Sequence, residues 1–234
     1  MQKKIIILMG ILVFNSPLIH SQQVILEENV LKDTVKRNFG QNLKHFAHVY
    51  LGYSVVIGQT NSKDGEIIPG LSNNFDIGLR YKYKISNFYS IGSEFSYNIN
   101  SYSIKQENGK RFPDEQIHKN ETLKNYALSL GIYNRFNFGK RGNYIGKFID
   151  LGINGDWCYS IRHLYKDDLG SNIKSRTVIK GLRFCEPFYY GLYGNIGFNR
   201  IVFTFRYRMS NIFKSKYNFP EMPPLTIGLQ AGLH

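Results

Sequence analysis

From residue 45 onward, hydrophobic and polar residues alternate along the chain in eight runs. The clearest run is 75–85, FDIGLRYKYKI, in which the odd positions are apolar or aromatic and the even positions are glycine or charged. Alternation with a period of two places the two sets on opposite faces of a β-strand. The eight predicted strands are 46–57, 75–85, 88–98, 125–137, 148–159, 186–197, 201–210 and 225–233.

The connections between these runs alternate between long and short. The four long connections (58–74, 99–124, 160–185 and 211–224) would share one end of the fold, and the three shorter ones (86–87, 138–147 and 198–200) would share the other end with both termini. Outer-membrane β-barrels have this asymmetry, with long extracellular loops and short periplasmic turns. The sequence therefore predicts an all-β domain over 45–234, an eight-stranded antiparallel up-and-down transmembrane β-barrel.

A soluble up-and-down barrel would show the same alternation, so side-chain volume has to separate the two architectures. An eight-stranded barrel has room inside for modest side chains only, and the apolar set here is rich in Phe and Tyr, with 17 of each in the chain. Aromatic residues of this set gather near the strand ends, and aliphatic residues fill the middle, as in the aromatic girdles of membrane barrels. We therefore expect the large apolar residues to face lipid.

The first 44 residues lack the alternation. Lys3 and Lys4 precede an apolar stretch that runs from Ile5 to Phe14, and small Ser21 follows. This is the pattern of a secretory signal peptide, predicted over 1–21, although a buried first strand or helix remains the alternative. Residues 22–44 are predicted to be a periplasmic lead-in segment. The expected location is the outer membrane of a Gram-negative bacterium.

A net charge of +13 would ordinarily suggest a nucleic-acid partner, but an exported protein has little occasion to meet one. The expected partners are outer-membrane lipid and lipopolysaccharide, the barrel-assembly machinery during insertion, and envelope or secretion-complex proteins. One predicted extracellular loop is basic and could contact lipopolysaccharide phosphates; an ordinary solvated loop is the alternative. Its basic residues are Arg162, Lys166, Lys174, Arg176, Lys180 and Arg183.

Two stretches resemble a known group of proteins. They are 135–157, RFNFGKRGNYIGKFIDLGINGDW, and the ending YRMSNIFKSKYNFPEMPPLTIGLQAGLH. Both are similar to segments of the small, porin-like outer-membrane β-barrel proteins of Bacteroidota, a broad group sometimes called PorT-like. The resemblance implies a barrel in the outer membrane and leaves its task open.

Charged residues on the other face of the strands are expected to point into the barrel. An isolated charge there would be costly, so each needs a partner. We expect Arg80 to pair with Glu94 and Arg135 with Asp150. Asp156 is the candidate partner of Arg206 and Arg208. The favoured interpretation is a network that plugs the barrel, and a polar pathway for protons or small ions is the alternative.

The two cysteines, Cys158 and Cys185, are predicted near the same end of neighbouring strands. An exported protein reaches an oxidising compartment, so a disulfide closing the loop between them is predicted. Two unlinked buried thiols are the alternative.

An enzyme that modifies lipid A would need a nucleophile beside a base. The best candidates are Ser160 and His163, near Asp167 and Asp168, but they lie in no recognisable acyltransferase or deacylase motif. No His, Cys or carboxylate group has metal-ligand spacing, and no glycine-rich phosphate loop is present, so neither a metal nor a cofactor is predicted.

The leading hypothesis is a non-enzymatic membrane scaffold that acts through its extracellular loops in surface integrity, adhesion or secretion-complex assembly. The alternative is a narrow transport conduit or a subunit of an export complex. Lipid A modification is the least favoured of the three.

Overall fold

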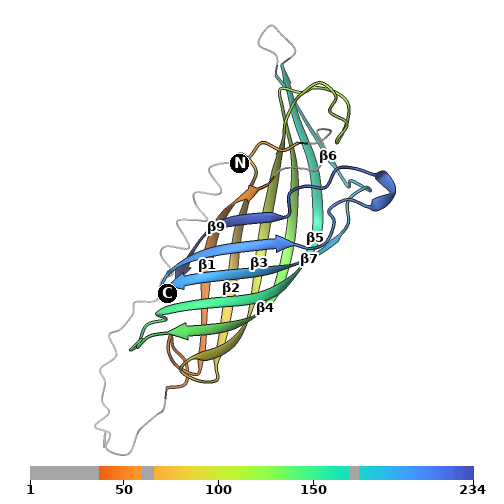
Figure 1. The fold of residues 1–234 in the computed structure, drawn as a ribbon. Coiled ribbons are helices and arrows are strands. Elements are labelled where there is room, and N and C mark those ends of the chain that lie inside the picture. The colour runs from red at the N-terminus through yellow and green to blue at the C-terminus, as the bar shows by residue number, and fades with distance from the viewer. Residues whose placement is uncertain (1–36, 59–65, 169–173) are drawn as a thin grey trace, which may run out of the picture. The chain divides into compact units, whose positions relative to one another are not determined.

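The computed structural model describes residues 37–58, 66–168 and 174–234, which form one antiparallel sheet (Figure 1). The predicted signal peptide and most of the lead-in segment lie outside the described residues. The strands are β1 (His45–Ile57), β2 (Asn73–Lys84), β3 (Tyr89–Ile104), β4 (Asn120–Phe138), β5 (Lys147–Asp168), β6 (Lys174–Lys180), β7 (Phe188–Phe198), β8 (Ile201–Arg208) and β9 (Leu225–Leu233).

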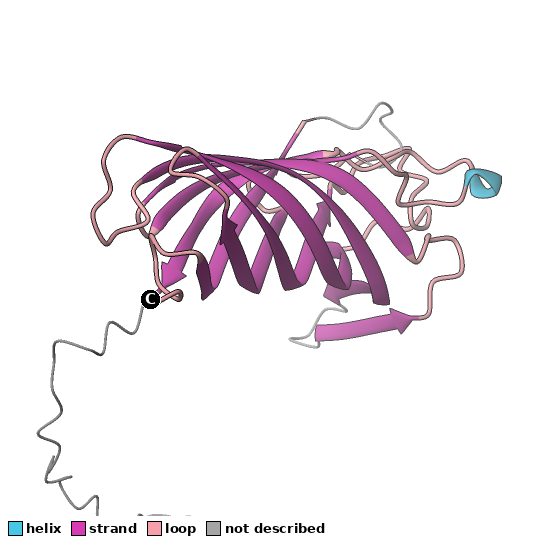
Figure 2. Ribbon diagram, turned by 90° about the horizontal axis from the view of Figure 1, so that it is seen from below, coloured by secondary structure: helices cyan, strands magenta, loops and turns pink. Residues whose placement is uncertain are grey.

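Eight of these strands close into a ring. Each pairs with the next along the chain, β5 pairs with β7, and β1 pairs with β9, with Val49 opposite Leu233 and Ile57 opposite Leu225. β6 pairs with the far end of β5 and stands outside the ring (Figure 2). The prediction of an all-β fold with eight antiparallel strands in a ring is confirmed.

The two ends of the ring carry different connections. The β1–β2, β3–β4 and β8–β9 connections are at one end, called here the loop end, and the β2–β3, β4–β5 and β7–β8 connections are at the other, the turn end (Figure 1). The β8–β9 connection contains a single turn of 3-10 helix, Ser215–Tyr217. Among the described residues, no helix is long and apolar enough to cross a membrane.

Side chains alternate between the two faces of the ring as the sequence predicted, with polar residues inside. On β2, Asp76 and Arg80 are fully buried, whereas Phe75, Ile77 and Leu79 are 41–49% exposed. Soluble proteins bury their large apolar residues and expose their charges, so this arrangement is inverted relative to a soluble protein.

Glycines let the interior aromatic side chains lie flat against a neighbouring strand. Tyr50 is opposite Gly78 across β1 and β2, and Tyr133 is opposite Gly92 across β3 and β4. A Cβ atom on Gly92 would lie 2.3 Å from the Tyr133 ring, closer than real Cβ contacts allow. Tyr193 and Phe148 face Gly152 and Gly197 in the same way. The interior is therefore filled by aromatic rings that fit only because the residue opposite each ring is a glycine.

Three strands are much longer than predicted. β3, β4 and β5 have 16, 19 and 22 residues and continue past the predicted limits 98, 125 and 159 at the loop end. The predicted loop 160–185 is therefore wrong in part, since the end of β5 and all of β6 form a paired ribbon in it, with Arg162 opposite Lys180. The charged residues of this ribbon interrupt the hydrophobic alternation in the sequence. The backbone hydrogen bonds that pair β5 with β6 do not depend on that alternation.

A bulge in β5 changes which residues face the interior. Tyr126 is opposite Ser160, while the next residue, Ala127, is opposite Cys158, so Tyr159 is an extra residue in β5. Even-numbered residues point inward up to Cys158, and odd-numbered ones, Ile161 and His163, point inward after the bulge. The bulge thus places His163 on the inner face.

Two hydrophobic clusters close the ends of the polar interior. At the loop end, Phe112 is fully buried and packs on Phe213 and Phe219, with ring centroids 4.6 and 5.0 Å away. Cys158, Cys185 and Met222 belong to the same cluster. At the turn end, Phe46, Ile145, Phe148 and Val202 form a smaller cluster.

Candidate functional site

The centre of the ring holds a network of charged side chains. Arg80 on β2 is opposite Glu94 on β3, and two of its nitrogens donate to one carboxylate oxygen: Nε and Nη2 are 3.2 and 2.9 Å from Glu94 Oε2. Arg206 reaches the same carboxylate from β8, with Nη2 3.2 Å from Glu94 Oε1. It also lies 3.7 Å from Asp76 Oδ2. Two arginines thus share Glu94 inside the ring, and Arg206 also faces Asp76.

A second ion pair lies nearer the turn end. Arg135 on β4 is opposite Asp150 on β5, and neither side chain is exposed. The contact is bidentate, with Nε 2.7 Å from Oδ1 and Nη2 2.8 Å from Oδ2, the geometry in which an arginine and a carboxylate bind most strongly. The guanidinium also stacks 3.6 Å from the centre of the Phe148 ring. Both pairs predicted from the strand register are therefore present.

The predicted pairing of Asp156 with Arg206 and Arg208 is wrong. Arg206 pairs with Glu94 and Asp76, as above, and Asp156 accepts a hydrogen bond from Asn154 at 2.9 Å. Arg208 lies at the end of β8 and points into the β8–β9 connection, where it contacts Glu221 at 3.3 Å and donates to the carbonyl of Met222 at 2.6 Å. Glu221 sits in a proline-containing connection whose path the alternation could not predict.

Little open space remains beside the central network. A cavity of about 50 Å³ lies against Asn98, Asn125 and Arg206, large enough for a few water molecules. Tyrosine rings, ion pairs and amide side chains fill the interior around it. The arrangement holds the strands together and offers no wide path for a solute along this part of the ring.

The cysteines are free, so the predicted disulfide is wrong, and the alternative of two buried thiols holds. The two residues are not opposite each other in the strand register. The backbone N–H of Cys158 donates to the carbonyl of Pro187, while Cys185 forms an isolated bridge with Phe213 in the β8–β9 connection. Each thiol is packed into the hydrophobic cluster at the loop end.

The predicted Ser160–His163 pair is not formed. Ser160 accepts a hydrogen bond from Arg162 at 3.3 Å, and His163 points inward, where its Nε2 lies 2.6 Å from Glu121 Oε1. The two residues are three positions apart on β5, so the alternation of the strand places Ser160 and His163 on opposite faces. Asp167 and Asp168 contact His118 and Lys119 instead.

Five of the six predicted basic loop residues lie on the β5–β6 ribbon at the loop end, and Arg183 lies in the connection that follows it. Arg162 is half-buried and stacks over the Tyr126 ring at 4.6 Å. The others are exposed on β5, on β6 or just after it: Lys166, Lys174, Arg176, Lys180 and Arg183. They line an ordered β-ribbon in place of a loop.

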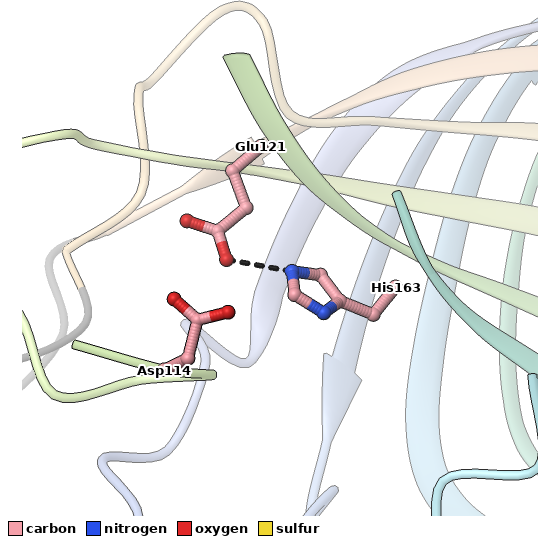
Figure 3. Close-up of side chains that lie close together, drawn as sticks. All are labelled: Asp114, Glu121 and His163. Atoms are coloured by element: carbon pink, nitrogen blue, oxygen red, sulfur yellow. Dashed lines mark hydrogen bonds and ion pairs between the residues drawn. The ribbon is translucent and has the colours of Figure 1, made fainter. Parts of the chain in front are cut away.

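The structure also brings together a charged cluster that the sequence did not reveal. This loop-end cluster consists of Lys110, Asp114 and His118 in the β3–β4 connection, Glu121 on β4 and His163 on β5. Figure 3 shows Asp114, Glu121 and His163. Four of the five side chains are almost fully buried, and Asp114 is 38% exposed. Lys110 Nζ contacts Glu121 Oε2 and lies 3.3 Å from Asp114 Oδ1. In the sequence, the one sign of this cluster is the spacing Lys-x3-Asp-x3-His-x2-Glu from Lys110 to Glu121.

Comparison of the chain with models of known protein families and with the sequences of curated proteins gives no match. The function is therefore inferred from the geometry of the site and the fold.

Proposed function

We propose that this protein is an outer-membrane β-barrel that serves as a non-enzymatic scaffold and presents a structured extracellular end. The observation that carries the proposal is the inverted distribution of side chains around a closed ring of strands. Charged residues such as Arg135 and Asp150 are completely buried inside, and large apolar residues are exposed outside on the strands of the ring.

The apolar outer surface fits a lipid bilayer better than water. Aliphatic side chains that are about half exposed or more occur on successive strands near mid-length, including Leu130 and Ile132 on β4 and Leu151 and Ile153 on β5. An exposed apolar surface of this extent on a soluble monomer would promote aggregation. A closed ring is also one of the few structures that leaves no backbone group unpaired in lipid.

The filled interior favours a scaffold over a conduit. Arg80, Arg206 and Glu94 cross the centre of the ring, and the apolar clusters block both ends. The extracellular end is expected to act through the β5–β6 ribbon, whose exposed Lys and Arg side chains suit the phosphates of lipopolysaccharide. Surface integrity, adhesion and assembly of a secretion complex are the roles that such a scaffold could have.

Insertion into vesicles tests the proposal. Urea-unfolded protein diluted into phospholipid vesicles should insert, migrate faster on a gel unless it is boiled, and become protected from protease in its strands. A protein that stays water-soluble and gives one gel band would contradict a membrane barrel.

Conductance separates the scaffold from the alternative conduit. Single-protein recordings in planar bilayers should show no steps of porin size for the wild-type chain. Steady conductance that changes in a Glu94→Gln variant would favour a pathway through the interior instead.

A further inference from the structure

The loop-end cluster has donor atoms arranged as a metal site would need them. One donor atom each from Asp114, Glu121 and His163 lies within 4.8 Å of the other two (Figure 3). β4 and β5 fix two of them: Leu123 is opposite His163, so Glu121 lies two residues further along the same inner face. Asp114 reaches the cluster from the β3–β4 connection.

His118 brings a further ring nitrogen against Asp114. Its Nδ1 lies 2.8 Å from Asp167 Oδ1, and a carboxylate can only accept, so the ring N–H is on Nδ1. The other ring nitrogen, Nε2, is buried and makes no hydrogen bond with any described residue, yet it lies 3.5 Å from Asp114 Oδ2. A lone pair and a carboxylate oxygen that face each other call for a proton or a cation between them.

The separation of His118 Nε2 and Asp114 Oδ2 suits two ligands of one cation. Ligand atoms about 2.1 Å from a tetrahedral zinc ion are about 3.4 Å from one another, close to the separation of His118 Nε2 and Asp114 Oδ2. The contact of His118 with Asp167 is also the usual arrangement of a metal-bound histidine, whose second nitrogen donates to a carboxylate. This bond fixes the orientation of the ring before any ion arrives.

Lys110 is the cation that the cluster holds now. Its ammonium group contacts Glu121 and lies 3.3 Å from Asp114, so it neutralises the two carboxylates that an ion would need. Lysine is a point charge on a flexible stem, which can withdraw from the cluster without moving a strand. A divalent ion would take its place and interact with both carboxylates and both imidazoles.

We propose that the loop-end cluster binds a divalent transition-metal ion of the zinc type through Asp114, His118, Glu121 and His163, in competition with Lys110. Two imidazoles and two carboxylates favour zinc over calcium or magnesium, which take oxygen ligands. Such an ion would tie the β3–β4 connection to β4 and β5. The inference does not depend on the membrane role, because His163 and Glu121 lie past the point where the pairing of β5 with β7 ends, at Trp157 and Phe188.

Calorimetric titration of the folded, EDTA-treated protein with Zn²⁺ tests this. We expect one ion per chain for the wild type, background heat for His118→Ala, and at least tenfold tighter binding for Lys110→Met. Asp167→Asn should weaken binding by about 10- to 100-fold, as loss of a carboxylate behind a histidine ligand does. His45→Ala removes a histidine at the turn end and should bind as the wild type does. Co²⁺ should give the visible absorption of a four-coordinate site.

The proposal would be overturned if neither the wild type nor Lys110→Met binds Zn²⁺ while both keep the near-ultraviolet circular dichroism of the folded state. The cluster would then be an ion-pair network only, with His118 protonated. Equal binding by His118→Ala and the wild type would also overturn it, since the ion would then be held elsewhere. Vesicle insertion is measured separately, so failure of one proposal leaves the other standing.

Discussion

Arg80 on β2 donates a hydrogen bond to Gln230 on β9, with Nη2 2.8 Å from Oε1. The two residues are 150 positions apart, and β1 lies between their strands. Gln230 in turn donates to Asp76 at 3.1 Å. A single buried amide therefore ties the last strand of the ring to the charged network on β2 and β3, so the closure of the ring and its interior charges depend on each other.

Replacing Glu94 should strongly destabilise the protein. Glu94→Gln leaves Arg80 and Arg206 buried with one negative partner fewer, and breaking a buried ion pair costs about 3–5 kcal/mol. Urea unfolding in vesicles, followed by fluorescence of Trp157, the one tryptophan of the chain, measures this. Glu107→Gln is the control, since Glu107 pairs with Lys105 at the exposed loop end. An equal effect of the two changes would show that the central network carries little stability.

Adding a methyl group at Gly92 should be costly because the Tyr133 ring occupies that space. A Cβ atom there would also lie 2.3 Å from the carbonyl oxygen of Tyr81. Overpacking of this kind costs about 1–3 kcal/mol. Gly155→Ala is the matched control, since nothing lies within 4 Å of its Cβ position. The same unfolding experiment should separate the two, and a Gly92→Ala variant as stable as the control would refute the close packing.

The proposed lipid contact predicts different costs for two leucines of equal exposure. Leu130 on β4 is 62% exposed and Leu71 in the β1–β2 connection is 61% exposed. Leu130→Arg should reduce the free energy of unfolding in vesicles by about 2–4 kcal/mol, the cost of arginine at the bilayer midplane. Leu71→Arg should change it little. In a water-soluble protein both changes would be equally mild.

The two cysteines should both react with a thiol reagent after unfolding and resist it in the native state. Burial raises the pKa of Cys185 to about 12, and the neighbouring Cys158 and Glu221 add to the increase. Alkylation requires the thiolate, so the native protein should react slowly at pH 8 and faster as the pH rises toward that pKa. Counting labels by mass spectrometry, with and without urea, gives the result. Protection that persists in urea without reductant would indicate a disulfide.

Much of the fold followed from the sequence because a half-buried strand leaves a period-two pattern. All eight strands of the ring were predicted, as were the cross-strand pairs Arg80–Glu94 and Arg135–Asp150, since a short connection fixes the register of a hairpin. Where pairing ran through charged residues, as in the β5–β6 ribbon, the pattern was lost, and the prediction of a loop was wrong.

The sequence by itself determined the alternation of apolar and polar residues. That alternation determines the ring of strands and which of its two faces is polar. Only the tertiary structure decided which side chains meet away from regular pairing. One extra residue, Tyr159, reverses the facing of β5 and brings His163 to Glu121. The path of the β3–β4 connection then adds Lys110, Asp114 and His118 to the same cluster. A bulge and an irregular connection do not follow the two-residue period of a strand. Their contacts therefore depend on how the chain packs in three dimensions.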